Sequence, residues 1–162
     1  MSVIIGIDPG SRRTGYGIIR VEGNRHIYLT SGYLDVSSFS LSEKLRQIFL
    51  GLQKVIQTFQ PQEAAIEQIF MHENPNSALK LGQARGAAIV ALDIPVTEYS
   101  ARQVKKSVVG NGAANKEQVQ YMVSRLLNLA KVLQADAADA LAVALCHAHV
   151  RNLRDIIKQQ NK

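Results

Sequence analysis

The chain has 162 residues, of which 46% are hydrophobic and 20% charged, and it carries a formal net charge of +6. This length and composition are typical of a globular protein, and no apolar run is long enough to cross a bilayer, which excludes a membrane-spanning class. The apolar N-terminal stretch has no basic leader before it, so we expect a cytoplasmic protein. The single cysteine, Cys146, excludes an intrachain disulfide and is expected in the core.

Apolar patterning and turn residues divide the sequence into ten expected elements. The first is a branched apolar run that stops at Pro9-Gly10, which is typical of a central strand followed by a turn. The elements, in chain order, are strands at residues 3–8, 14–21 and 26–34, a helix at 41–59 capped by Ser40 or Ser42, a strand at 64–69, a helix from Asn76-Ser77 to about Leu92, a strand at 95–99, and helices near 102–108, 115–129 and 136–150. This order predicts an α/β fold with a mixed five-stranded sheet and helices on both faces. We expect a single domain at residues 1–150 and a polar C-terminal tail at 151–162.

Four acidic residues are embedded in apolar sequence: Asp8, Glu67, Asp136 and Asp139. Asp8 and Glu67 each end a predicted central strand, so they converge at one edge of the sheet if the strands are parallel neighbours. Asp136 and Asp139 are three residues apart at the start of a helix and share one face. Burying unpaired carboxylates is costly, and one or two Mg²⁺ ions would satisfy several of them at once. The pattern therefore predicts a site that hydrolyses phosphodiester bonds with two metal ions.

Each of these acids also has a structural explanation. Asp8 before a Pro-Gly pair could be a turn residue, and Asp136 could cap a helix. Asp139 is less open to such an explanation because apolar residues surround it. The positive net charge must lie outside the acidic set, and it is as typical of an ordinary basic protein as of a nuclease that holds phosphates.

Several segments carry a resemblance to a known family. They are Gly6-Ile7-Asp8-Pro9-Gly10-Ser11 with Thr14-Gly15-Tyr16-Gly17, Ile66-Glu67-Gln68 followed by Phe70, residues 77–86, and residues 134–142. Together, and in this order, they resemble the RuvC Holliday junction resolvase family through nearly the whole chain. The resemblance implies an RNase H-like fold and a homodimer that makes paired, metal-dependent nicks in opposing strands of four-way junction DNA during recombination and repair.

The same resemblance implies roles for individual residues and partners. It identifies Asp8, Glu67, Asp136 and Asp139 as the catalytic, metal-binding set, with two Mg²⁺ ions per active site for which Mn²⁺ can substitute. It also implies the branch-migration proteins RuvA and RuvB as partners.

Aromatic and basic residues near the acids are candidates for contacts with DNA. Phe70 could stack on an unpaired base of the junction or pack in the core, and the resemblance favours the junction. Similar RuvC proteins have DNA-contacting lysines at the positions of Lys105 and Lys116, although a solvated surface lysine is the ordinary alternative. Arg12 and Arg13 follow the turn after the first strand and are expected to contact the DNA backbone.

Small residues recur four apart on the second predicted helix, at Ala78, Gly82 and Gly86. Such a stripe permits close approach either to the chain's own sheet, which the sequence alone favours, or to a second subunit. Because a resolvase must cut two symmetry-related strands, we expect this stripe to form a dimer interface.

Three rival functions fit parts of the sequence. The first hairpin also resembles phosphotransferases of the actin and Hsp70 type, but those proteins close two such domains around ATP and this chain has the length of one. An RNase H-like nuclease acting on another nucleic acid, such as an RNA–DNA hybrid, would use the same chemistry. A junction-binding protein without catalysis would bind DNA equally well in Mg²⁺ and in chelator and would never cut it.

Overall fold

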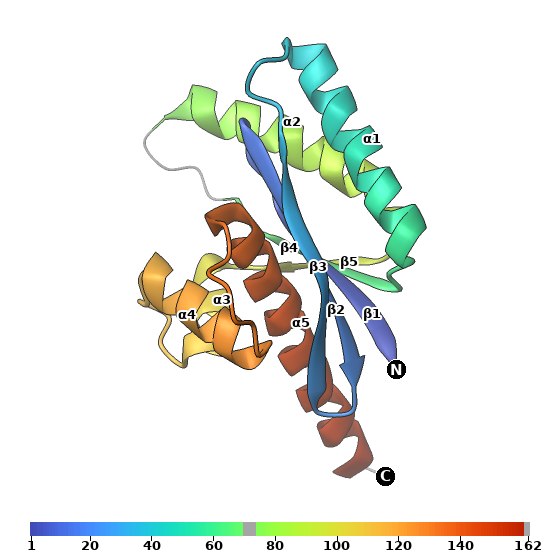
Figure 1. Cartoon of the computed structure of the whole chain (residues 1–162), viewed down its shortest axis with the longest axis vertical. Helices are drawn as coiled ribbons and strands as arrows, with labels where there is room; N and C mark the ends of the chain where they lie inside the picture. The colour runs from blue at the N-terminus through green and yellow to red at the C-terminus, as the bar shows by residue number, and fades with distance from the viewer. Residues whose placement is uncertain (70–73, 161–162) are drawn as a thin grey trace.

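The fold is a five-stranded sheet with helices on both faces, as expected from the order of the elements. The computed structural model describes residues 1–69 and 74–160, with side chains described up to residue 153 in the last helix. Its elements are β1 (Ser2–Asp8), β2 (Arg13–Glu22), β3 (Arg25–Asp35), α1 (Leu41–Phe59), β4 (Glu63–Glu67), α2 (Pro75–Leu92), β5 (Val96–Tyr99), α3 (Ala101–Val109), α4 (Lys116–Leu126) and α5 (Ala135–Gln160). The strand order is β3-β2-β1-β4-β5; β1 is antiparallel to β2 and parallel to β4. Helices α1 and α2 cover one face and α3, α4 and α5 the other (Figure 1).

Side chains of the central strands point alternately to the two faces of the sheet and form one apolar core on each face. In β1, Ile4 packs in the core beneath α3, α4 and α5, whereas Ile5 and Ile7 pack in the core beneath α1 and α2. In β2, Ile19 and Ile18 divide between the two cores in the same way. All five side chains are fully buried. The continuous apolar runs of these strands therefore reflect burial on both faces, because successive strand residues point to opposite sides.

Helix α5 lies directly against the backbones of β1 and β2. A Cβ atom on Gly6 would lie 2.1 Å from the carbonyl oxygen of Ala140, and one on Gly15 would lie 2.1 Å from the carbonyl oxygen of Asp136. Real side chains cannot approach backbone so closely, so the strands admit the helix only where they lack side chains. We call the strand positions that face α5 in this way the glycine seam; they are Gly6, Gly15 and Gly17.

The turn after β1 is tight and internally bonded. Thr14 is fully buried, and its hydroxyl donates to the carbonyl oxygen of Gly10 at 3.3 Å while it accepts from the Gly10 N–H at 3.4 Å. A Cβ on Gly10 would lie 2.0 Å from the carbonyl oxygen of Arg13, so the turn also requires glycine there. This turn closes directly behind Asp8 and holds that residue at the end of the strand.

Helix α2 begins slightly earlier than expected. Its cap is Asn74, whose side-chain oxygen accepts from the N–H groups of Asn76 and Ser77, the two residues expected to cap it. Pro75 occupies the first helical turn, where its missing N–H costs nothing and its fixed φ favours the helix. The helix therefore starts at the proline and not after it.

The small-residue stripe of α2 faces solvent in the described structure. Gly82 and Gly86 are exposed, and a Cβ on either would meet no described atom within 4 Å, while Ala78 is half-buried. The opposite face of the helix is the buried one, with Ala84, Ala88, Ala91 and Leu92. Packing of the stripe against the chain's own sheet, which the sequence alone favoured, is therefore wrong.

Helix α5 continues beyond Val150 to Gln160, so the expected tail is helical as far as the structure describes it. The Arg151 guanidinium donates to the Ser2 hydroxyl and to the Glu63 carboxylate, which anchors the helix where a polar tail was expected. Polar composition alone does not reveal such a contact. None of the described helices is long and apolar enough to cross a membrane.

The glycine seam generates a paired stability prediction. Gly6→Ala should lower the free energy of unfolding by about 1–3 kcal/mol or more, because the added methyl group overlaps the α5 backbone. Gly82→Ala is the matched control and, at concentrations that keep the protein monomeric, should raise it by about 0.5–1 kcal/mol, because alanine stabilises an exposed helical position relative to glycine. Urea unfolding followed by circular dichroism measures both. Equal effects of the two substitutions would contradict the close contact of α5 with β1.

Candidate functional site

Three of the four predicted acids line one cavity at the edge of the sheet. Asp8 ends β1 and Glu67 ends β4, and the parallel pairing of these strands places both residues at the same edge. The N-terminal turns of α5 reach this edge across the glycine seam and bring Asp139 to it. Asp8, Glu67 and Asp139 line a cavity of about 260 Å³, which we call the acidic cavity.

Asp136 lies beside the acidic cavity and lines a second cavity of about 460 Å³. Its carboxylate accepts from the side-chain amide nitrogen of Gln134 at 2.5 Å, and the side-chain amide oxygen of Gln134 accepts from the Ala137 N–H at 3.1 Å. The Gln134 side chain therefore caps α5 by accepting from a backbone N–H of its first turn. Asp136 is not the cap of this helix. Gln134 was not singled out in the sequence, because glutamine is not among the residues that usually cap the start of a helix.

Burial and mutual repulsion disfavour ionisation in the acidic cavity. Burial raises the pKa of Asp8 to about 8, and the negative charges of Asp139, Glu67 and Asp136 add to this rise while Lys116 opposes it. A carboxyl group in such surroundings keeps its proton near neutral pH unless a cation replaces it. Asp8 is thus the member of the set whose ionisation needs a positive partner most.

Two lysines face the acids across the acidic cavity. Burial raises the pKa of Glu67 and of Asp139, and Lys105 and Lys116 oppose both shifts. Lys116 opens α4, and its ammonium nitrogen lies 3.8 Å from a carboxylate oxygen of Asp139, with 74% of its side chain exposed. Lys105, on α3, lines the same cavity. The exposed ammonium group of Lys116 is free to move toward a bound phosphate.

The acids suit a hard divalent cation in the chemistry of their oxygen donors. Carboxylate oxygens are the ligands that Mg²⁺ prefers in proteins, and a cation would relieve the repulsion that keeps Asp8 protonated. Among the described residues, no three carboxylate, imidazole or thiol groups are already close enough to share one ion. The donor set therefore fits a cation in kind, and ligand side chains must draw together when one binds.

Arg12 and Arg13 both line the second cavity, but their side chains are placed differently. The Arg13 guanidinium pairs with Asp35 at 3.2 Å and lies 5.2 Å from the centre of the Tyr33 ring. Hydrogen bonds from Ser37, and then from Arg13, lower the pKa of Asp35 to about 2, so its carboxylate is ionised and holds Arg13. Arg12 is exposed at the rim of the cavity. Phe70 lies outside the described residues.

Comparisons with known proteins agree with the resemblance seen in the sequence. The family model for the crossover junction endodeoxyribonuclease RuvC matches residues 4–147. A curated protein of that name from Tolumonas auensis is 60% identical over 154 residues, which cover 93% of this chain and 89% of the relative. The RuvC structure from Thermus thermophilus matches with a TM-score of 0.84 at 34% identity, over 93% of this chain and 96% of that one. A T. thermophilus RuvC solved in complex with Holliday junction substrate matches with a TM-score of 0.88 at 33% identity, over 94% of this chain and 96% of that one. The fold is therefore RNase H-like.

The raised pKa of Asp8 predicts that metal-free protein is stabilised by removing this acid. Its folded-state pKa of about 8 exceeds the ordinary 3.8, so the folded chain holds a proton that the unfolded chain releases, and stability falls as the pH rises between these values. In EDTA, Asp8→Asn should be more stable than wild type by about 1–3 kcal/mol at pH 8 and nearly equal to it near pH 4. Urea unfolding across this pH range measures the difference.

Asp93→Asn serves as the control, because Asp93 is exposed at the end of α2 and both residue types suit its left-handed φ of 43°. It should show little change in stability across the same range. A gain in Asp8→Asn that did not grow with pH would contradict the assignment of a retained proton to Asp8.

Proposed function

The chain belongs to the RuvC family of crossover junction endodeoxyribonucleases, and from this premise we propose how its acidic cavity acts on DNA. It is a Holliday junction resolvase, which cleaves phosphodiester bonds in four-way junctions during recombination and repair. The observation that carries the proposal is the acidic cavity, where Asp8, Glu67 and Asp139 meet opposite Lys105 and Lys116. Carboxylates that hold cations beside ammonium groups that hold phosphate are the combination that this cleavage needs.

The proposed catalytic set is Asp8, Glu67 and Asp139, with Asp136 completing it from the neighbouring cavity. We assign Mg²⁺ to these residues, two ions per site, with Mn²⁺ able to substitute. Bound ions would activate a water and stabilise charge on the leaving oxygen. Asp8 must release its proton for binding, which the ions favour and which Lys116 already assists. The sheet edge and α5 hold the backbones of these half-buried residues in place, so that only their side chains need to move when an ion binds.

The proposed DNA contacts surround this cavity. Lys105 and Lys116 would neutralise phosphate charge near the scissile bond, because both already face the acids. Arg12 is the better candidate for a backbone contact than Arg13, whose guanidinium is held by Asp35. Stacking of Phe70 on an unpaired base stays a prediction. The net charge of +6 supports a DNA-binding surface outside the acids.

We also propose a homodimer, since two symmetric strands must be cut in one junction. The exposed face of α2 supports this, with Gly82 and Gly86 open to solvent and Val90 70% exposed beside them. Glycines on an exposed helix permit a second helix to approach closely. Each protomer would then supply one acidic cavity for paired nicks in opposing strands. RuvA and RuvB are the proposed partners of this dimer, and the cytoplasm is its proposed location.

Replacement of single acids tests the catalytic assignment. Asp8→Asn and Glu67→Gln should each reduce cleavage of a labelled four-way junction by at least about a hundredfold, because one ligand oxygen charge is lost from the site. Junction binding in EDTA should persist, because basic groups supply most of the affinity. Gel assays with Mg²⁺ or EDTA measure cleavage and binding separately.

The same assay distinguishes the rival functions. Preferred cleavage of RNA–DNA hybrid over junctions would favour another RNase H-like activity. Binding without cleavage by wild type in Mg²⁺ and in Mn²⁺ would favour a junction-binding protein without chemistry. Substantial cutting by a folded Asp8→Asn protein would refute the assignment of the site.

Lysines that line the acidic cavity should affect cleavage more than a neighbouring lysine that does not line it. Lys105→Ala and Lys116→Ala should slow cleavage by about tenfold or more while weakening binding much less, if their charges act near the scissile phosphate. Lys106→Ala is the control, because Lys106 neighbours Lys105 in α3 but is exposed and does not line the cavity. Single-turnover cleavage and titration binding measure the two quantities. An equal loss in both for all three variants would make these lysines general backbone contacts.

The α2 face gives a prediction for assembly. Gly82→Glu places a charged side chain on the exposed stripe and should shift the protein from dimer to monomer in sedimentation velocity experiments. Lys80→Glu is the control, because it adds negative charge to the same exposed helix two residues away. A wild-type protein that sedimented as a monomer at every concentration would contradict the proposed interface.

A further inference from the structure

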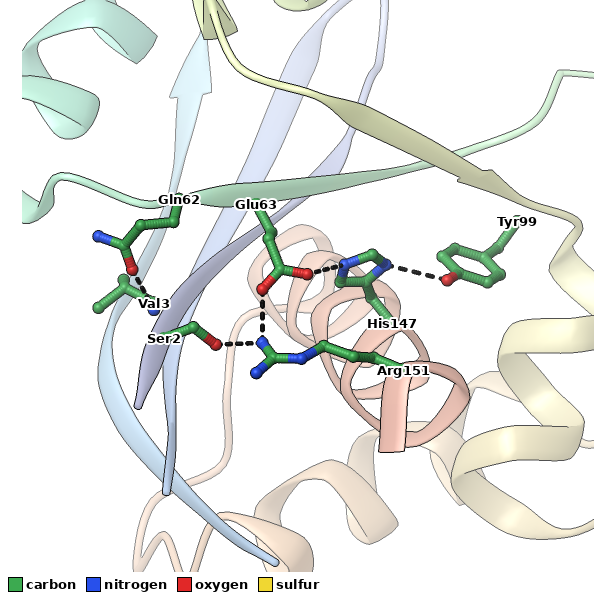
Figure 2. A network of polar contacts seen from close by, with 7 residues as sticks. All are labelled: Ser2, Val3, Gln62, Glu63, Tyr99, His147 and Arg151. Carbon is green, nitrogen blue, oxygen red and sulfur yellow. Dashed lines mark hydrogen bonds and ion pairs between the residues drawn. The ribbon is translucent and has the colours of Figure 1, made fainter. Parts of the chain in front are cut away.

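A chain of polar contacts ties α5 to the sheet (Figure 2). The Tyr99 hydroxyl lies 2.9 Å from Nδ1 of His147, and Nε2 of His147 lies 2.9 Å from a carboxylate oxygen of Glu63. The other Glu63 oxygen accepts from Arg151 at 2.5 Å, and Arg151 also donates to Ser2. We call Tyr99, His147, Glu63 and Arg151 the α5 network.

Both rings of the network are buried and fully oriented. His147 is 6% exposed and Tyr99 is 3% exposed, with ring centroids 5.8 Å apart at 69°. With Nδ1 unprotonated and Nε2 protonated, the imidazole accepts a hydrogen bond from the Tyr99 hydroxyl and donates one to Glu63, whose carboxylate also accepts from Arg151. Each ring nitrogen then has a partner, and any rotation or displacement of the ring would leave a buried polar atom unsatisfied.

The α5 network joins the elements that carry two of the proposed ligands. Glu63 is the first residue of β4 and Glu67 is the last. Tyr99, the last residue of the neighbouring strand β5, pairs in register with Glu67 of β4. His147 lies on α5 about two turns beyond Asp139, on the same helix. The contacts between Tyr99, His147 and Glu63 thus connect the backbone that holds Glu67 to the backbone that holds Asp139.

The glycine seam does not by itself fix the position of α5 along the helix axis. It sets how close α5 lies to β1 and β2, whereas side chains that contact the helix resist movement along its axis, and the α5 network supplies directional polar contacts among them. A slide of one residue would move Asp139 by about 1.5 Å. Because Mg²⁺ binds oxygen ligands at about 2.0–2.1 Å in near-octahedral geometry, such a slide is large enough to prevent binding.

We propose that Tyr99 and His147 are positioning residues for cation binding, acting by fixing α5 relative to β4 and β5. This rests on the proposed function, because it concerns the cations assigned to the acidic cavity. Neither residue lines that cavity, so each acts through the placement of Asp139 and Glu67.

The test uses a substitution that removes a single oxygen atom. Tyr99→Phe keeps the buried ring but loses the hydroxyl, and it should raise the Mn²⁺ dissociation constant, measured by electron paramagnetic resonance of free Mn²⁺, by about 3–10-fold. The Mn²⁺ and Mg²⁺ concentrations for half-maximal junction cleavage should rise by the same factor, with most of the maximal rate recovered at saturating metal. Junction binding in EDTA should not change.

Tyr28→Phe is the matched control. Its hydroxyl lies 3.2 Å from that of Ser31 within β3, a strand that carries none of the acids. It loses the same atom and should leave metal binding unchanged. His147→Gln, whose amide keeps a donor toward Glu63, should raise the dissociation constant less than His147→Ala does.

The outcomes separate the inference from the proposed function. A lower thermal midpoint for Tyr99→Phe with unchanged metal dependence would mean that the network is structural alone and would overturn the inference. A wild-type protein that neither binds Mn²⁺ nor cleaves junctions would overturn the proposed function and the inference with it. If the His147 variants fail to fold, Tyr99→Phe against Tyr28→Phe still decides.

Discussion

The contact of α5 with bare strand backbone is the constraint on which the site depends. A helix normally rests on a layer of side chains, but at Gly6 and Gly15 that layer is missing and the helix backbone meets the strand backbone. This close backbone contact brings the first turns of α5 to the sheet edge where Asp8 ends β1. With ordinary side chains in the seam, Asp139 would lie farther from Asp8 and the acids would not share a cavity.

The same closeness concentrates negative charge in a protein that is otherwise basic. Burial and neighbouring carboxylates hold Asp8 in its protonated form near neutral pH, so the folded chain without cations carries an unfavourable site. Lys105 and Lys116 relieve part of this repulsion from the facing helices. Stability at this edge of the sheet is thus lowered in exchange for affinity toward cations, which is a common property of functional sites.

Much of the fold could be predicted because its elements are strongly patterned. Helix α1 has the bounds that its apolar spacing predicted, and β1 and β4 are parallel neighbours, which was the condition for Asp8 and Glu67 to meet at one edge. The missed features depend on contacts between distant residues. The end of α5 was wrong because Arg151 bonds to the first strand and to β4, which polar composition cannot reveal. The cap of α2 was wrong because Asn74, Asn76 and Ser77 are all good caps, and the choice among them is set by backbone geometry.

The contact between the two ends of the chain also bears on the order in which the protein is made. Ser2 and Arg151 are 149 residues apart in the sequence, and β1 packs against α5, which is translated long after it. Closing so long a loop is entropically costly, and domains rich in distant contacts fold slowly. A nascent chain that ends before α5 lacks Asp136 and Asp139 and leaves one core of the sheet uncovered. The complete set of acids can therefore assemble only after α5 has been translated. Unfinished copies that lack this helix cannot cut DNA through that set.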